Sequence, residues 1–499
     1  MGYKRLNNCS ILRGVSMIAI VGLLSSCQMY KPDEQKSESF EKSIPETFID
    51  SSDEELVVDE KWWQEFGDEQ LNEFIEEALQ NSPSLGEIYA RLNSAQAQVD
   101  ISETQLFPSL DATASAQVGD SASNGVESYG LSFAASYELD LWGKVNASIQ
   151  SSQANLMQAK MNTQTAVNTL ISNIVIAWIQ IQSEMRYREV LESQLKVNTE
   201  TLESMYFRFS MGRSDNILDV LQQRQTTNTT RNAIPLSEQA ECLYRSKLCI
   251  LLGKPANTKL KIDLVKDIAN PRDLPTSGIP TQIFEGRPDI KASKYALMSA
   301  MWTLASAKAD RLPKIALSSA VPVLSFQSDR ISSLFENWTI QIAGMISQPI
   351  FDAGLRNATV RQNQALALEA FNSYKSTVLS ALAEVQDSIT NESTQKRYIT
   401  SLLKSYENAG DMLSESKNRY AKGLTDYLDV ASSITTTQSL ELNLITAKRD
   451  LILYRLSLYS TLGGAWITNI SDKVEKEKNK IYENSNFAPI EAEVLGQYL

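Results

Sequence analysis

The sequence contains no histidine among its 499 residues. Imidazole supplies the general base of Ser-His-Asp and Cys-His pairs and is a common zinc ligand, so these pairs and zinc sites with histidine ligands are excluded. An enzyme would have to use carboxylates or lysines, and no pattern of paired carboxylates points to one. We therefore expect a protein that is not an enzyme and that holds no cofactor and no metal.

Cysteine, basic charge and long apolar runs are also scarce. Four cysteines are too few for a disulfide framework, and Cys242 and Cys249 would lie about 10.5 Å apart along a helix, so we expect both to pack in the core. The net charge of −13 includes no basic block, which argues against a nucleic-acid partner. The mean hydropathy of −0.24 leaves little room for a bundle of membrane helices.

The N-terminus has the features of an export signal. Basic residues precede an apolar run, Val15–Leu24, that is too short to span a bilayer, which needs about 20 residues. Two serines and Cys27 follow at once, in a pattern that resembles the bacterial lipoprotein signal. The resemblance implies a signal peptide over residues 1–26, a lipid anchor on Cys27 and, without a following Asp, transport to the outer membrane. An ordinary signal peptide with a chance cysteine is the alternative.

The remainder of the chain is an internal repeat. Pro83 matches Pro288, and further matches keep the same order over some 170 residues, which predicts two similar halves of about 200 residues each. The matched pairs are Leu92 and Leu297, Pro108 and Pro313, Gly143 and Gly354, Arg208 and Arg419, and Gly212 and Gly423.

Each half contains very long stretches that favour helix. No Gly or Pro occurs from Lys144 to Met211, where a continuous helix would be roughly 100 Å long. The second half lacks both residues from Leu355 to Ala409 and from Leu424 to Leu462. Apolar residues recur there at the alternating three- and four-residue spacing of a coiled coil, so we expect paired long helices.

Each half also contains two segments that predict strands. Residues 109–118 and 129–141 alternate apolar and polar side chains around a predicted loop at 119–128, and residues 315–323 and 338–346 repeat the pattern. Such strands suit either a transmembrane β-barrel or a small soluble sheet with one buried face. Four strands cannot close a barrel, and open edges cannot lie in lipid, so in a membrane several chains would have to share one barrel.

Six motifs in order now resemble a known family, the TolC-like outer-membrane efflux channels, and most closely the lipoprotein branch that works with RND pumps. The likeness runs from about Lys61 to Trp466. The motifs are Trp62–Asp68, Leu106–Leu110, Tyr137–Gly143, Arg287–Ile290, Gln348–Gly354 and Arg419–Val430.

The resemblance implies a mixed α+β membrane protein made mostly of long helices. Three copies would form a periplasmic α-barrel that continues into one 12-stranded transmembrane β-barrel, with four strands from each chain. Its partners would be outer-membrane lipid, a periplasmic adaptor and an inner-membrane pump, and its function the efflux of drugs or toxic compounds. Metal-ion efflux and type I protein secretion remain open within this class, and a lipid-anchored periplasmic coiled-coil scaffold without a pore is the alternative outside it.

We expect the following division of the chain. A signal peptide (1–26) precedes an anchor and equatorial segment (27–82), the first repeat (83–255, hairpin 109–141, helix pair 144–253), a linker (256–285), the second repeat (286–466, hairpin 315–350, helix pair 355–463) and a charged tail (467–499).

Candidate functional residues lie where the expected elements meet. Proline lacks a backbone donor and glycine permits unusual dihedral angles, which suits corners between strands and helices and turns at helix tips. The expected corners are Pro108, Gly143, Pro313 and Gly354, and the expected tip turns are Gly212 and Gly423.

Four carboxylates lie near the expected helix tips, at Asp215, Asp219, Asp426 and Asp429. They have two interpretations, as helix N-caps or as rings of charge that narrow a closed entrance. By resemblance, Asp429 matches an acidic gate residue of the family. Ion pairs or hydrogen bonds of Arg208, Arg419 and Tyr420 would hold the tips shut, although exposed pairs are often weak and simple solvation is the alternative.

Overall fold

The computed structural model describes residues 39–42, 62–66, 68–121, 124–212, 216–265, 286–326 and 340–462. The predicted signal peptide over residues 1–26, Cys27, Asp215 and the charged tail over residues 467–499 lie outside these described residues. The predicted linker at 256–285 is described only over its first ten residues.

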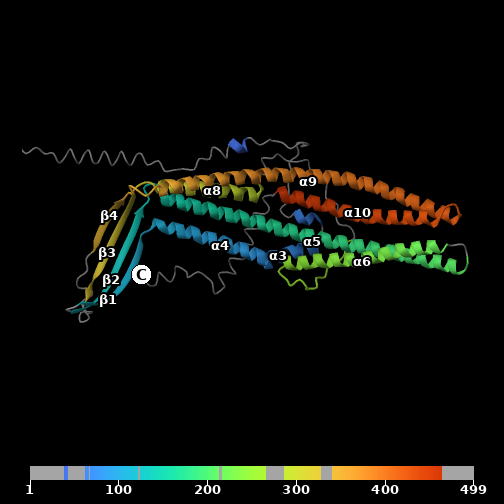
Figure 1. The fold of residues 1–499 in the computed structure, drawn as a ribbon, viewed down its shortest axis with the longest axis horizontal. Helices are drawn as coiled ribbons and strands as arrows, with labels where there is room; N and C mark the ends of the chain where they lie inside the picture. The colour runs from blue at the N-terminus through green and yellow to red at the C-terminus, as the bar shows by residue number, and fades with distance from the viewer. Residues whose placement is uncertain are drawn as a thin grey trace, which may run out of the picture. The chain divides into compact units, whose positions relative to one another are not determined.

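The order of elements repeats, as the sequence predicts (Figure 1). A short helix η1 (Trp62–Phe66) and helix α3 (Glu69–Asn81) come first, and the single turn η2 (Thr104–Leu106) follows α4. The first repeat contains α4 (Pro83–Glu103), β1 (Ser109–Ser121), β2 (Asn124–Leu139), α5 (Lys144–Ser210) and α6 (Ile217–Leu251). The second contains α8 (Pro288–Ala309), β3 (Lys314–Phe326), β4 (Gln341–Ser347), α9 (Leu355–Ala421) and α10 (Tyr427–Leu462).

The two long helices α5 and α9 each contain 67 residues and begin in the same way. An aspartate just before each helix accepts hydrogen bonds from backbone N–H groups that have no partner within the helix. Asp140 accepts from Val145 and Asn146 at 3.1 and 2.8 Å, and Asp352 accepts from Arg356 at 3.2 Å. Such caps fix where a helix starts and place negative charge at its positive end.

The four strands form one antiparallel sheet in the order β1-β2-β3-β4. The predicted loop at 119–128 is wrong, because β1 continues to Ser121 and pairs there with Asn124 at the start of β2. The Gly and Asn residues in this stretch favour turns when taken alone. Continued pairing satisfies their backbone N–H and C=O groups, and this outweighs their weak strand propensity.

The strand register separates the two faces of the sheet. Leu110, Ala135, Ser319 and Ile342 lie in one row across the four strands, and Ser109, Ser136, Ser318 and Ala343 lie in the next row on the opposite face. The first face is mostly apolar, with Leu110 and Ile342 73% and 79% exposed. The predicted alternation is therefore confirmed, and none of the described residues buries these two side chains.

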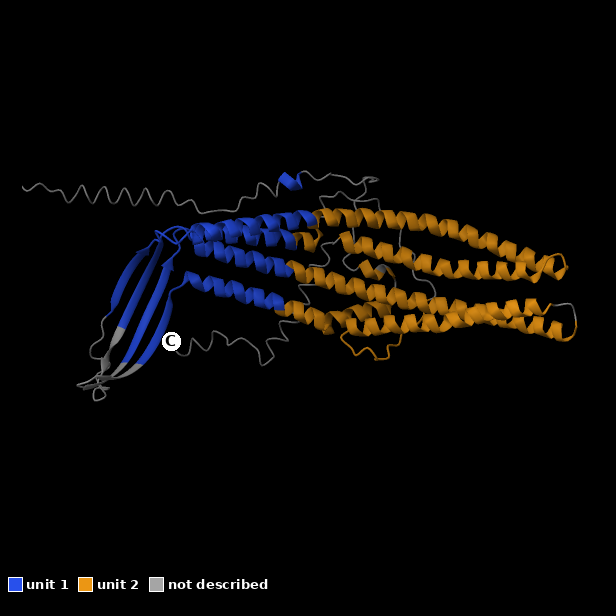
Figure 2. Ribbon diagram, in the orientation of Figure 1, with its two compact units in different colours: residues 1–43, 91–160, 292–376 blue, residues 44–90, 161–291, 377–499 orange. Residues whose placement is uncertain are grey.

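The chain divides into two units, shown in different colours in Figure 2. Unit 1 consists of residues 1–43, 91–160 and 292–376 and contains the sheet. Small polar residues pack its helices closely, and the Ser151 hydroxyl on α5 lies 2.9 Å from the Thr303 and Ser299 hydroxyls on α8.

Unit 2 consists of residues 44–90, 161–291 and 377–499 and has a conventional apolar core. Trp62 is buried, and its ring lies 5.8 Å from that of Tyr459 on α10. One ion pair is fully enclosed, with Arg455 on α10 donating to Glu392 on α9 at 2.8 and 2.5 Å. Because removing one partner would leave a buried charge, this pair fixes how α9 and α10 align.

The expected core packing of both cysteines is half right. Cys249 is buried, and its thiol donates to the Thr258 carbonyl at 3.4 Å, because the segment after α6 folds over this end of the helix. Burial also raises the pKa of the Cys249 thiol. Cys242 lies about two turns before Cys249 in α6. It is exposed, because the segment after α6 does not reach it.

No helix among the described residues combines the length and the apolar character needed to cross a bilayer.

Gly253 ends α6 in a conformation that only glycine accepts easily. Its φ is 74°, and an added Cβ would lie 2.6 Å from the Asn81 carbonyl oxygen. We expect Gly253→Ala to lower the free energy of unfolding by about 2 kcal/mol or more. Gly212→Ala, with a φ of 66° and open space around the new methyl group, should cost about 1 kcal/mol. Denaturant unfolding followed by helical circular dichroism measures both, and equal midpoints would contradict the predicted clash.

Candidate functional site

The α9–α10 turn closes with a complete set of C-terminal hydrogen bonds. Gly423 has a φ of 71°, its N–H donates to the Tyr420 carbonyl at 2.9 Å, and the Leu424 N–H donates to the Arg419 carbonyl at 2.9 Å. At the end of α5, Gly212 also has a positive φ, of 66°, and its N–H donates to the Phe209 carbonyl at 3.1 Å. Both predicted turn glycines thus lie at helix ends with the positive φ that glycine accepts.

The carboxylates at the tips differ in their surroundings. Asn216, and no aspartate among the described residues, caps α6 by accepting from the Leu218 N–H at 3.2 Å. Asp219 lies in the first turn of α6 and is half-buried. Asp426 directly precedes α10, and Asp429 in its first turn accepts a hydrogen bond from the Thr425 hydroxyl. Asp426 and Asp429 are both exposed, so their charges reach the solvent.

Tyr427, at the start of α10, is the centre of this region, and the sequence reasoning missed it. Its ring is 2% exposed and packs edge-on against Tyr420, with the centroids 5.4 Å apart. Its hydroxyl donates to the Gln223 side-chain oxygen on α6. Burial, Tyr420 and the Asp219 carboxylate raise the pKa of Tyr427, so its hydroxyl stays protonated and remains a donor.

All four long helices contribute to one apolar cluster around Tyr427. The buried members are Met205 on α5, Val220 on α6 and Val430, Ala431 and Ile434 on α10, with Leu413 and Tyr420 on α9 packed against them. The cluster joins the two helix hairpins near their turns, which stabilises one arrangement of the tips.

A row of buried amides continues from Tyr427 along the same helices. Gln223 donates to the Asn198 carbonyl at 2.7 Å, and the side-chain amides of Asn198 and Gln438 exchange two hydrogen bonds at 3.0 and 3.2 Å. Gln194 then donates to Glu441 at 2.8 Å. This amide row therefore links α5 and α6 to α10 through hydrogen bonds that specify register, whereas apolar contacts would allow several.

Of the predicted network, the structure places Arg208 and Tyr420 near Tyr427 and Arg419 in the turn. Arg208, Asp219 and Tyr420 lie near enough to Tyr427 to shift its pKa, Arg208 in the lowering direction. Arg419 is exposed and contributes its backbone carbonyl to the turn. The usable signal for Tyr427 was an aromatic residue between two acids, Asp426 and Asp429, four residues after the turn glycine Gly423.

The predicted corner residues lie where strands and helices meet. Pro108 and Pro313 directly precede β1 and β3. Gly143 and Gly354 directly precede α5 and α9 with φ of 73° and 86°. These positions set the direction in which each long helix leaves the sheet.

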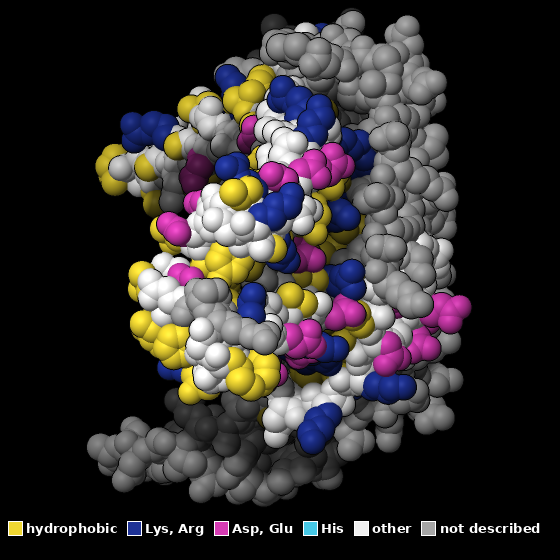
Figure 3. All heavy atoms as spheres, turned by 90° about the vertical axis from the view of Figure 1, so that its right-hand side faces the viewer, with side chains coloured by type: hydrophobic (Ala, Val, Ile, Leu, Met, Phe, Trp, Pro, Cys, Tyr) yellow, Lys and Arg dark blue, Asp and Glu magenta, His cyan; other side chains and the backbone are white. Residues whose placement is uncertain are grey.

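Figure 3 views the side on which the helix turns lie, and acidic, basic and hydrophobic side chains are interspersed there. Phe207, Met211, Leu424 and Leu428 are each at least 60% exposed. Within the described residues, no group of three acidic or cysteine side chains is placed to hold a metal ion. The site therefore offers exposed charge and apolar contact surface.

The family model described as "Outer membrane efflux protein" matches residues 74–245 and 279–464 of this chain. Among curated relatives, the pyoverdine export outer membrane protein OpmQ of Pseudomonas aeruginosa is 26% identical over 419 residues, which cover 81% of this chain and 87% of OpmQ. The cation efflux system protein CusC of Escherichia coli is 27% identical over 423 residues, which cover 81% of this chain and 88% of CusC.

Solved structures give the same fold. The outer-membrane channel OprN has a TM-score of 0.76 and 25% identity, with 85% of this chain and 99% of OprN covered. The predicted fold class, long helices with a few strands of a TolC-like channel, is confirmed.

The hydroxyl of Tyr427 provides the first test of the site. Tyr427→Phe leaves the buried Gln223 oxygen without its donor, which costs about 1–3 kcal/mol locally. We expect amide hydrogen exchange over residues 427–434 to speed up about tenfold, with Tyr398→Phe, at an exposed tyrosine of α9, as the matched control. Unchanged exchange over these residues in Tyr427→Phe would show that the hydrogen bond does not hold the tip.

Proposed function

We propose, because this chain belongs to the outer membrane efflux protein family, that three copies of it form one continuous channel through the outer membrane. The chain is an outer-membrane efflux channel by its family, its relatives and its fold. The trimer, the shared barrel, the lipid anchor and the gate described below are our proposals.

The four-stranded sheet is the observation that carries the proposal. Its two edge strands, β1 and β4, have no partner on their outer sides in the described part of the chain, and its apolar face is exposed. In lipid, every backbone group needs a partner, so each edge must pair with another chain. Three chains with four strands each give a 12-stranded barrel whose polar face lines the pore.

Energy and cargo must come from partners, because the sequence contains no Walker phosphate-binding loop. Members of the family form trimeric channels that work with periplasmic adaptors and inner-membrane pumps. The exposed apolar residues at the helix turns, such as Phe207 and Leu424, provide a surface on which an adaptor would dock. In this proposal the chain conducts and performs no enzymatic reaction.

The cargo is proposed to be drugs or other toxic compounds. One relative is named for pyoverdine export and another for cation efflux, so the shared channel fold does not itself select the substrate. Deletion of the gene followed by growth against drugs, detergents, dyes and metals tests this. Sensitivity to one class, matched by deletion of one pump, would identify the cargo, whereas unchanged growth on all of them would count against toxic-compound efflux.

The lipid anchor on Cys27 receives support from the residues that follow it. Glu41 accepts hydrogen bonds from the Tyr374 hydroxyl at 2.7 Å and from Lys294 at 3.0 Å, and the Phe40 ring packs edge-on against Tyr374. These contacts attach residues 39–42 to α8 and α9 within unit 1. We propose that the acyl chains and the barrel thereby enter the same membrane.

The gate is proposed to lie at the helix turns. In a trimer, each of Asp219, Asp426 and Asp429 would occur three times around one axis, and like charges at a constriction attract cations and repel anions. Arg208, Tyr420 and the Tyr427–Gln223 hydrogen bond would hold the hairpins in the closed arrangement.

The two faces of the sheet provide a matched test of the barrel. Ile342→Lys places a charge on the apolar face, where Lys near the bilayer midplane costs about 2–4 kcal/mol in each chain. Ala343→Lys places the same charge on the polar face. We expect the first variant to be lost from the outer membrane and the second to insert and alter pore conductance, measured by membrane fractionation and planar bilayers. Equal insertion of both variants would point to the pore-free scaffold.

Asp429→Asn tests the gate at the α10 turn. Removing three negative charges from the constriction should raise closed-state conductance or weaken block by divalent cations in planar bilayers. Thr425→Val removes the hydroxyl that donates to Asp429 and leaves its charge, so it should behave like the unmodified channel. Single-channel behaviour of Asp429→Asn that matches Thr425→Val would refute a gating role for this carboxylate.

A further inference from the structure

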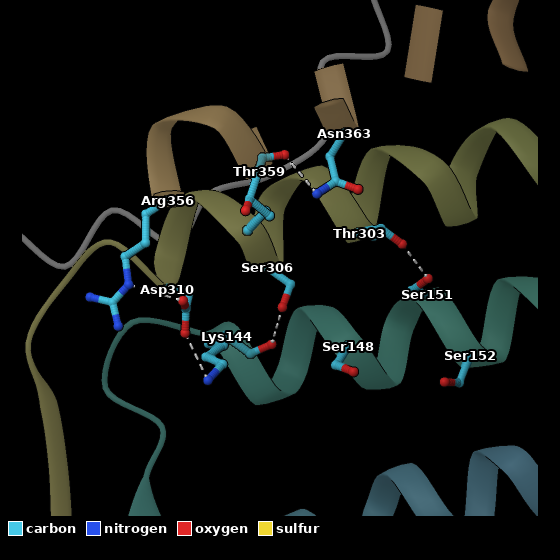
Figure 4. Close-up of a pocket in the computed structure, with 11 residues that line it drawn as sticks. Lys144, Ser148, Ser151, Ser152, Thr303, Ser306, Asp310, Arg356, Thr359 and Asn363 are labelled. Atoms are coloured by element: carbon cyan, nitrogen blue, oxygen red, sulfur yellow. Dashed lines mark hydrogen bonds and ion pairs between the residues drawn. The ribbon is translucent and has the colours of Figure 1, made fainter. Parts of the chain in front are cut away.

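A polar pocket of about 310 Å³ lies within unit 1, between the N-terminal ends of α5 and α9 and the C-terminal end of α8 (Figure 4). Its size is that of a small-molecule site. Hydroxyl, amide and charged side chains form almost all of its lining, and they include Ser148, Ser152, Thr359, Asn363, Lys144 and Arg356.

Positive charge exceeds negative charge at one end of this pocket. The Asp310 carboxylate lies 2.9 Å from Lys144, 3.4 Å from Lys314 and 3.4 Å from Arg356. Glu138 is the second carboxylate of the cluster, 3.7 Å from Lys144. Within the lining itself, Lys144 and Arg356 face the carboxylate of Asp310, so the lining carries one net positive charge.

The neighbouring aspartates, Asp140 and Asp352, are not part of the lining. Asp140 and Asp352 accept hydrogen bonds from the backbone N–H groups that begin α5 and α9. Each of these carboxylates lies at the N-terminal end of its helix and interacts with the partial positive charge there.

One donor of Arg356 has no acceptor. Its Nη1 atom is buried and forms no hydrogen bond to any residue that the structure describes, although Nε faces Asp310. A buried charged donor without an acceptor destabilises the folded protein. Guanidinium groups bind carboxylates and phosphates well, because their N–H groups match the spacing of two oxygens.

We propose that this pocket binds a small oxyanion, a carboxylate or a phosphate, held by Arg356 and Lys144. The anion would supply the missing acceptor for Arg356 Nη1 and balance the excess positive charge.

The position of the pocket gives the proposal a role in transport, which rests on the proposed function. Lys314 and Glu138, which complete the charge cluster, lie on the polar face of the sheet, and that face would line the pore. Three such pockets would surround the pore of a trimer. Anionic cargo would meet a ring of positive sites in a chain whose net charge is −13.

Equilibrium dialysis of the detergent-solubilised trimer with radiolabelled inorganic phosphate measures the site. We expect saturable binding of about one phosphate per chain, competed by acetate and insensitive to chloride at constant ionic strength. Competition by acetate distinguishes a general oxyanion site from one that is selective for phosphate. Arg356→Gln should weaken binding at least tenfold, and Arg361→Gln, an exposed arginine of the same helix outside the pocket, should bind as the unmodified protein does.

A second variant keeps the test valid if Arg356→Gln fails to assemble. Asn363→Asp leaves the cation cluster intact and adds a negative charge to the lining, so it should also weaken phosphate binding at least tenfold. Circular dichroism and the trimer band on native gels establish that each variant folds and assembles.

Absence of saturable binding of phosphate or acetate at concentrations up to about 100 mM would overturn the proposal. Unchanged phosphate binding in both pocket variants would also overturn it. A second copy of the chain that filled the pocket would give the first of these results. Planar-bilayer conductance of the same preparations separates the two proposals. Conductance without anion binding would refute the anion site and leave the channel proposal standing. Anion binding without conductance would refute the channel proposal.

Discussion

Backbone hydrogen bonding at the two open edges of the sheet is the constraint on which the rest of the structure depends. Each chain pairs β1 to β4 in sequence and then stops, with an exposed apolar face beside those edges. In water, the open edges can form hydrogen bonds to solvent, but a large exposed apolar face is unfavourable. In lipid, the apolar face is favourable, but the backbone groups of the edges have no hydrogen-bond partners. The proposed closed assembly of several chains in a membrane would satisfy both conditions, in keeping with an outer membrane efflux protein.

The long helices meet a different requirement in this proposal. They keep the α5–α6 and α9–α10 hairpins in register without closing them permanently. The amide row from Gln223 through Asn198 to Gln438 links α5 and α6 to α10 by hydrogen bonds, and the cluster around Tyr427 joins the tips. Hydrogen-bonded seams specify one alignment and exchange partners with water at little net cost. In the proposed gate, an arrangement of this kind would be stable when shut and able to open when a partner binds.

Local patterns in the sequence predicted much of the fold. The alternation through Leu110 and Phe133, the long stretches without Gly or Pro and the glycines at 212 and 423 each depend on neighbours in the chain, and each appears in the structure. The loop at 119–128 was wrong because strand pairing overrides turn propensity. Tyr427 with Gln223 and the pocket at Arg356 were missed because their partners lie far away in sequence, 204 residues in the first case. No local pattern reports such a pairing.

One measurement tests the shared barrel most directly. Within a chain β1 and β4 lie three strand spacings apart, about 14 Å, which is too far for a short thiol cross-linker. One cysteine at Thr113 in β1 and one at Ala343 in β4, in a Cys242→Ser background, would therefore be joined only between chains. We predict that cross-linking in outer membranes gives products that end at three chains. Single chains alone, or a ladder that continues beyond three, would contradict a closed trimer.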